Sequence, residues 1–86
     1  MYKVEILNEA VEELSRIDPI WQKRILKKIK ILFDNPQNLA NNIKKLKGKY
    51  HEYFRLRVSD YRVIYSQETD RLVILIVRVG HRKEIY

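Results

Sequence analysis

Two short runs separated by two residues constrain the fold of this chain most strongly. Residues 53–58 (YFRLRV) and 61–66 (YRVIYS) each alternate apolar and polar side chains with the period of two that is typical of β-strands. Only Ser59 and Asp60 lie between the two runs, and this spacing predicts a tight β-hairpin. The middle of the chain is therefore expected to form two adjacent antiparallel strands.

The hairpin also predicts which side chains share a face of the sheet. If Val58 pairs with Tyr61, the apolar side chains of both strands fall on one face, which we expect in the core. The opposite face then carries Tyr53, Arg55, Arg57, Arg62 and Ile64. Arg57 would lie directly opposite Arg62, and like charges across a strand pair cost up to about 1 kcal/mol. We interpret this face as a binding surface for an anion.

A third run, residues 71–79 (RLVILIVRV), is almost continuously apolar. Such a run is typical of a central strand that is covered on much of both faces. It ends at Gly80 and is followed by the basic tail HRKEIY. We expect three strands to bring their polar ends and this tail to one region.

The first half of the chain predicts a strand and two helices. Residues 2–6 alternate as a short strand, and Asn8 is the expected N-cap of a first helix. Asp18 followed by Pro19 predicts the start of a second helix that runs to about Phe33. The apolar positions assigned to the buried sides of these helices are Ala10, Val11, Leu14, Ile17, Trp21, Ile25, Ile29 and Leu32.

The segment between the second helix and the hairpin predicts one or two short helical turns. Leu39, Ile43 and Leu46 have helical spacing, and Lys47 with Gly48 resembles a helix end. The complete layout is β-α-α-β-β-β. It predicts one α+β domain over residues 1–86, with a helical hairpin packed on a largely antiparallel sheet of about four strands.

Composition narrows the possible partners and sites. The 18 Lys and Arg residues exceed the 11 Asp and Glu residues, giving a net charge of +7. This excess favours a polyanionic partner, most often nucleic acid and less often an acidic protein, although a well-solvated basic surface is the alternative. The absence of cysteine excludes disulfides and thiolate metal sites, and two histidines without motif spacing predict no metal. No membrane span or signal-peptide pattern occurs, so we expect a cytoplasmic protein.

The segments LKGKY, YFRLRVSDYRVIY and VILIVRVGHRKEIY resemble the RelE-like branch of the RelE/ParE superfamily of toxins from toxin–antitoxin modules. The resemblance extends from the opening strand to the last residue and is most specific at RLRVSDYRVIY and GHRKEIY. It implies an α+β fold and an endonuclease that cleaves ribosome-bound mRNA at the A site without a metal or other cofactor. It also implies a cognate antitoxin, with the toxin either monomeric or in a hetero-oligomer with that antitoxin.

The resemblance also suggests site residues by position. The basic residue after the family's tight turn corresponds to Arg62, and the one after the glycine of the last strand corresponds to Arg82. The C-terminal tyrosine corresponds to Tyr86. Two lysines that some members carry are replaced here by Arg55 and Tyr53. At those two positions the chain departs from the family pattern, and the resemblance does not identify a general base.

Metal-free RNA cleavage uses the adjacent 2′-hydroxyl as nucleophile, so the protein must stabilise charge on phosphorus and move two protons. We assign charge stabilisation to Arg62 and Arg82, assisted by Arg55 or Arg57, because guanidinium groups bind phosphate bidentately and stay charged. Arginine is a poor base. The candidate base is His81, whose ordinary pKa lies near neutrality, with a hydrogen-bonding or stacking role as the alternative.

Five further residues each have a functional and a structural interpretation. Tyr86 either orients the 2′-hydroxyl or stacks on a base, or it simply closes the C-terminus over the sheet. The same alternatives apply to Tyr53. The lysines Lys45, Lys47 and Lys49 either contact the RNA backbone or belong to a solvated loop.

Two other functions stay open from the sequence. One is a ParE-like toxin that inhibits DNA gyrase and cuts nothing, and the other is a catalytically inactive RNA-binding relative. The set of Arg62, Arg82 and Tyr86 favours the endoribonuclease. That interpretation requires Arg62 and Arg82 to face a common region of the molecule.

Overall fold

The computed structural model describes residues 3–34, 41–46, 53–68 and 71–85, with the side chain of Ile85 left out. The elements are β1 (Lys3–Ile6), α1 (Asn8–Ser15), α2 (Pro19–Asp34), β2 (Ile43–Lys45), β3 (Phe54–Val58), β4 (Tyr61–Glu68), β5 (Val73–His81) and α3 (Arg82–Ile85). The strands form one sheet in the order β1-β5-β4-β3-β2, in which β1 is parallel to β5 and the other neighbours are antiparallel. This confirms the predicted α+β fold.

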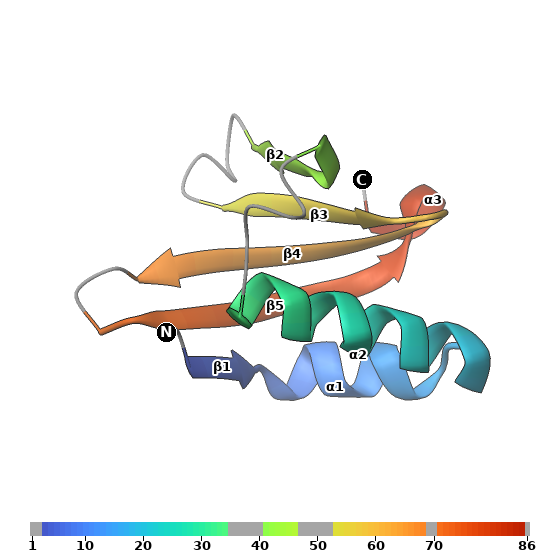
Figure 1. Cartoon of the computed structure of the whole chain (residues 1–86). Helices are drawn as coiled ribbons and strands as arrows, with labels where there is room; N and C mark the ends of the chain where they lie inside the picture. Colours follow the sequence, from blue (N-terminus) through green and yellow to red (C-terminus); the bar gives the residue numbers. More distant parts are fainter. Residues whose placement is uncertain (1–2, 35–40, 47–52, 69–70, 86) are drawn as a thin grey trace.

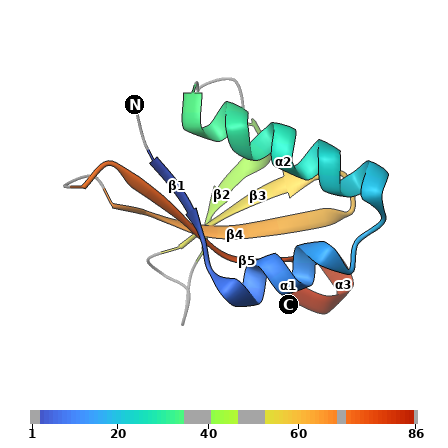
Figure 2. The same ribbon diagram turned by 90° about the horizontal axis from the view of Figure 1, so that it is seen from below.

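The helices lie on different sides of the sheet. Figure 1 shows α1 continuing from β1 along the β5 edge, with α2 lying across the front of the strands. Figure 2 shows α2 on one side of the sheet and the short α3 on the other. The C-terminal segment is therefore brought to the face of the sheet that α2 does not cover. Within the described residues, no helix is long and apolar enough to span a lipid bilayer.

The core lies between α2 and the sheet. Ile25, Ile29 and Leu32 of α2 pack with apolar side chains from the strands, and Ala10 and Leu14 of α1 extend the same cluster. These five helical positions confirm the predicted buried stripe. Ile17 and Trp21 are half-buried. Val11 was predicted to be buried, and this is wrong, because its side chain is 48% exposed.

The helix starts follow the predicted signals at one of the two sites. The Asp18 carboxylate accepts a hydrogen bond from the Ile20 N–H at 3.0 Å, as expected of an N-cap. Asn8 is not a cap, because it is already the first helical residue and Leu7 occupies the cap position. The Leu7 N–H donates to Ile76 O at 3.0 Å and its carbonyl accepts from Val11 N. The first helix therefore begins where the strand ladder ends, before Asn8 can cap it.

Residues 43–45 form strand β2, so the predicted helical turn at Ile43 is wrong. Ile43 pairs with Leu56 of β3, and the next two residues continue the pairing. Backbone hydrogen bonds to the edge of β3 outweigh the helical spacing of a few apolar residues. The sheet consequently has five strands, against about four expected. Leu39, Lys47 and Gly48 lie outside the described residues.

Candidate active site at the β3–β4 turn

Four arginines lie on the face of the sheet away from α2, which we call the arginine face: Arg55, Arg57, Arg62 and Arg78. In the first row, Arg57 of β3 pairs with Arg62 of β4, which in turn pairs with Gly80 of β5. The neighbouring row places Arg55 of β3 and Arg78 of β5 on either side of one β4 residue. Adjacent strands are about 4.8 Å apart. The predicted hairpin register is confirmed, and it gathers four guanidinium-bearing side chains within the width of three strands.

Arg62 is held by the turn that precedes it. Its side chain is only 9% exposed, and Nη1 donates to Ser59 O at 2.8 Å and to Tyr61 O at 2.9 Å. Ser59 has a positive φ of 55°, which turns the chain sharply between the strands. Gly80, opposite Arg62, contributes no side chain to this face of the sheet. The turn therefore fixes one cation in place.

Arg82 is attached to the same turn. Its backbone N–H donates to Asp60 O at 2.8 Å, and its Nε lies 3.9 Å from Asp60 Oδ1. The Arg82 side chain is 56% exposed, so this ion pair is weak and open to exchange with another anion. Arg62 and Arg82 are thus anchored to two successive carbonyls, those of Ser59 and Asp60. Both residues therefore contact the β3–β4 turn, and their action on one common phosphate stays a prediction.

Comparison with known proteins gives the family of the chain. The family model described as "ParE toxin of type II toxin-antitoxin system, parDE" matches residues 4–86. Toxin RelE3 of Methanocaldococcus jannaschii is 43% identical over 68 residues, covering 72% of this chain and 74% of that protein. The chain is a RelE-like member of the RelE/ParE toxin superfamily.

A solved structure and a second sequence relative are also similar to this RelE-like toxin. The crystal structure of the archaeal RelE–RelB complex from Pyrococcus horikoshii superposes with a TM-score of 0.79 at 30% identity, covering 96% of this chain and 97% of that one. The mRNA interferase toxin RelE of Escherichia coli strain K12 is 24% identical over 87 residues, covering 99% of this chain and 90% of that protein.

The other predicted RNA-binding residues of the toxin are spread over both faces. Tyr53 precedes β3 and is half-buried, and its carbonyl accepts from Leu46 N at 3.0 Å. Lys45 is exposed but pairs with Phe54, a side chain packed against the core, so it belongs to the α2 side of the sheet. Its neighbour Lys44 pairs with Arg55 and lies on the arginine face. Lys47, Lys49 and Tyr86 lie outside the described residues.

His81 lies on the face opposite Arg62. It pairs with Tyr61, and their rings contact edge to face with centroids 5.7 Å apart. Tyr61 in turn contacts Trp21 of α2, with ring centroids 5.5 Å apart. The His81 Nδ1 accepts a hydrogen bond from Lys83 N at 3.2 Å. The sheet therefore separates His81 from the turn-bound guanidinium of Arg62, and its predicted role as a base has no support from geometry.

Arg78 is a member of the arginine face that the sequence analysis did not single out. Its Nη2 lies 2.8 Å from Glu13 Oε2, while Glu13 Oε1 accepts from Val79 N at 3.1 Å. One carboxylate of α1 thus accepts a hydrogen bond from a backbone N–H of β5 and forms an ion pair with Arg78. A β-bulge in the pairing of β4 with β5 brings Arg78 to this face. The almost continuously apolar run of residues 71–79 does not indicate where such a bulge lies.

The described part of the chain contains no group of three or more His, Asp or Glu side chains that could hold a metal ion. The charged groups at the β3–β4 turn are instead Arg57, Arg62, Arg82 and the Asp60 carboxylate. Such guanidinium groups suit a phosphate, which each can bind through two parallel N–H donors. The arrangement can therefore bind a phosphodiester and stabilise additional negative charge on it.

Proposed function

We propose that this toxin is an endoribonuclease that cleaves mRNA at the ribosomal A site and so inhibits translation. The observation that carries the proposal is the anchoring of Arg62 and Arg82 to successive carbonyls of one turn. The name of the Escherichia coli relative, an mRNA interferase toxin, supports the same reaction class. In this proposal, the scissile phosphate binds between the two guanidinium groups.

The reaction is a transesterification within the substrate. The 2′-hydroxyl oxygen attacks the adjacent phosphorus, the bond to the 5′-oxygen breaks, and the products are a 2′,3′-cyclic phosphate and a 5′-hydroxyl end. One proton leaves the 2′-oxygen and one is delivered to the 5′-oxygen. Arg62 and Arg82 stabilise the extra charge on the non-bridging oxygens, where one well-placed donor is worth about 2.7 to 4 kcal/mol.

The remaining residues of the arginine face position the RNA. Arg55 and Arg57 contact phosphates on either side of the scissile one, and Tyr53 stacks on a base beside them. Tyr86 orients the 2′-hydroxyl. We assign no proton transfer to His81, because Arg62 and His81 lie on opposite faces of the sheet. Lys47 and Lys49 stay predicted contacts to the RNA backbone.

The partner proposed to control this activity is a cognate antitoxin. The Pyrococcus horikoshii relative was crystallised as a RelE–RelB complex, at 30% identity to this chain. The toxin is then a free monomer when active and part of a hetero-oligomer when inhibited. Because its substrate is ribosome-bound mRNA, the proposed place of action is the cytoplasm.

Expression without antitoxin tests the proposal directly. We expect arrest of translation and messages truncated within codons at the A site, with 2′,3′-cyclic phosphate ends. Arg82→Ala should lower the cleavage rate by about 10²- to 10³-fold, since it removes one charge-stabilising donor. Arg62→Ala should do the same. Lys23→Ala, an exposed position on α2, is the matched control and should cleave normally.

Circular dichroism and urea unfolding must show that the arginine variants are folded. Normal cleavage by folded Arg62→Ala and Arg82→Ala would refute the assignment. The second candidate function is inhibition of DNA gyrase, which is favoured by the match to the ParE family model. Intact messages together with double-strand DNA breaks would select that candidate.

A further inference from the structure

A second cationic surface lies on the other side of β3. A groove of about 460 Å³ separates α2 from the C-terminal end of β3. Four of its lining residues are basic, and among the described residues that line it none is acidic. The basic residues are Arg24, Lys27, Lys28 and Arg57. We propose that this groove binds the backbone of single-stranded RNA where the strand continues beyond the cleavage site, an inference that rests on the proposed function.

The α2 sequence builds one wall of the groove. Trp21, Arg24, Lys28 and Ile31 follow a spacing of three, four and three residues, which places them on one side of a helix. The Arg24 guanidinium lies 4.8 Å from the centre of the Trp21 ring. This cation–π contact keeps the guanidinium against the indole ring and restricts its position. One wall thus presents a pre-oriented phosphate-binding group.

The groove is continuous with the proposed active site through Arg57. Pairing of β2 with β3 ends at Leu56, so β3 is an edge of the sheet from Arg57 onward. Arg57 lines the groove and also pairs with Arg62 on the arginine face. A strand whose phosphate lies at Arg62 therefore meets Arg57 next and then the cations of α2. The basic residues form one path around the end of the hairpin.

RNA fits this path better than an acidic peptide does. An amphipathic peptide would need an exposed apolar strip, but the apolar groove residues Trp21, Ile31 and Val58 are half-buried or buried. Phosphates need only the cations, which contact the RNA backbone without reading its sequence. Basic residues on both walls attract such a strand, and none of the described residues that line the groove is acidic.

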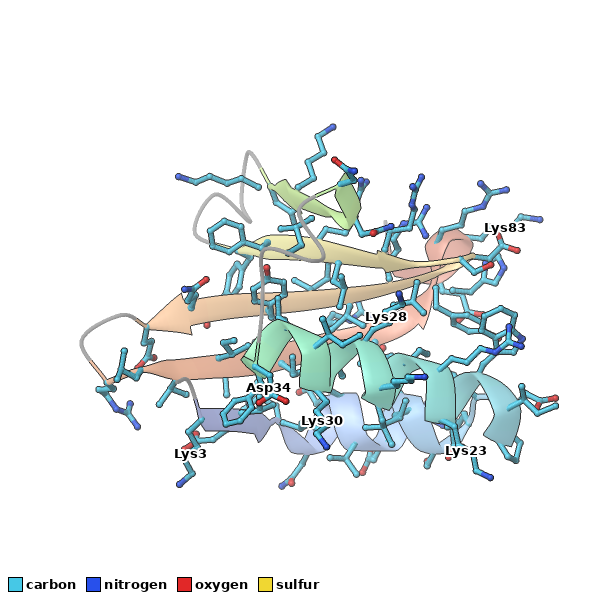
Figure 3. The ribbon with its side chains drawn as sticks, viewed as in Figure 1. Lys3, Lys23, Lys28, Lys30, Asp34 and Lys83 are labelled. Atoms are coloured by element: carbon cyan, nitrogen blue, oxygen red, sulfur yellow. The ribbon has the colours of Figure 1, made fainter. Side chains whose placement is uncertain are left out.

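The same helix offers a matched control. Figure 3 shows Lys28 on the strand-facing side of α2, whereas Lys23 and Lys30 extend toward the side of α1. Lys23 and Lys30 are exposed and do not line the groove. Lys27→Ala/Lys28→Ala and Lys23→Ala/Lys30→Ala therefore remove the same charge from the same helix at different distances from the groove.

The experiment measures binding of fully 2′-O-methylated RNA, which lacks the nucleophile and cannot be cut by the proposed reaction. Oligonucleotides of 3 and 12 nucleotides are titrated against the intact toxin and both double variants over a range of salt concentrations. We expect the groove variant to bind the 12-mer roughly tenfold more weakly and the 3-mer nearly normally. Its salt dependence, as the slope of log K against log salt, should fall by about 0.7 for each lost phosphate contact. Arg24→Ala should act in the same direction, and the control variant should match the wild type.

Equal losses in the groove and control variants would overturn the proposal, because they would show a general charge effect. Normal 12-mer binding by the groove variant would overturn it too. So would a groove variant that loses binding only to an acidic peptide or only to ribosomes, and not to the 12-mer. The result is independent of cleavage, since no RNA is cut in the assay. Failure of the nuclease proposal would appear separately, as intact unmodified message.

Discussion

The two faces of the β3–β4 hairpin are made by the same residues in alternation, yet they have different physical roles. On one face, Leu56 and Val63 form a pair that is 0% exposed and packs against α2. On the other face, the next pair along the strands, Arg57 with Arg62, places two like charges side by side. The first pair stabilises the fold, while the second brings like charges together at a cost of up to about 1 kcal/mol and belongs to the proposed anion site. The buried core and the proposed site are therefore one step apart along a strand.

The largest effect on stability should come from the apolar face. Leu56→Ala removes a fully buried side chain and should lower the free energy of unfolding by about 2 to 5 kcal/mol. Arg57→Ala, one residue further on, should change it by less than about 0.5 kcal/mol or raise it, because a like-charge contact is lost. Urea unfolding of both variants measures the contrast. Comparable losses at the two positions would show that the faces are not separated in this way.

An intermediate effect is expected where α1 reaches the arginine face. Glu13→Ala leaves the Val79 N–H and the Arg78 guanidinium without their carboxylate, and should cost roughly 1 to 3 kcal/mol of stability. Arg78→Ala keeps the hydrogen bond from Val79 to Glu13 and should cost less. Thermal unfolding of both variants ranks them. An Arg78→Ala variant less stable than Glu13→Ala would mean that the ion pair, rather than the bond to the β5 backbone, is the main contribution.

The hairpin could be predicted because its determinants are local. Alternation with period two and a two-residue connection specify the pairs from Phe54 with Tyr65 to Val58 with Tyr61. The contact of Arg62 and Arg82 with one turn agrees with the same register, since Gly80 lies opposite Arg62. The three-residue strand β2 was missed because so short a segment carries no periodic signal, and only its pairing with β3 defines it.

The positions along β5 required information that no local pattern carries. Ile74 and Ile76 lie in the core, but so does Val79, three residues further on, because the bulge shifts the alternation. Arg78 therefore joins the arginine face, and its partner Glu13 is 65 residues away in the chain. His81, although adjacent to Arg82, shares the core-facing side with Val79 and Tyr61. Sequence proximity to a proposed active-site arginine does not place a strand residue on the same face.

The smallest expected effect again concerns the apolar face and is absent at neutral pH. Burial raises the pKa of Tyr65 to about 12, and its ring stacks on Phe54 with centroids 5.5 Å apart. Because the folded state holds the phenol proton more tightly than the unfolded state, the protonated Tyr65 stabilises the fold. This contribution is complete below pH 10. The contribution should decrease as the pH rises from about 10 to 12, by up to about 2 kcal/mol. Tyr65→Phe lacks the phenol proton, so the difference in unfolding free energy between wild type and variant should be constant below pH 10. Above pH 10 the wild type should lose stability relative to the variant.

Lysine side chains titrate in the same range, but they do so in both proteins and cancel in the difference. A constant difference up to pH 12 would show that Tyr65 ionises without cost in the fold.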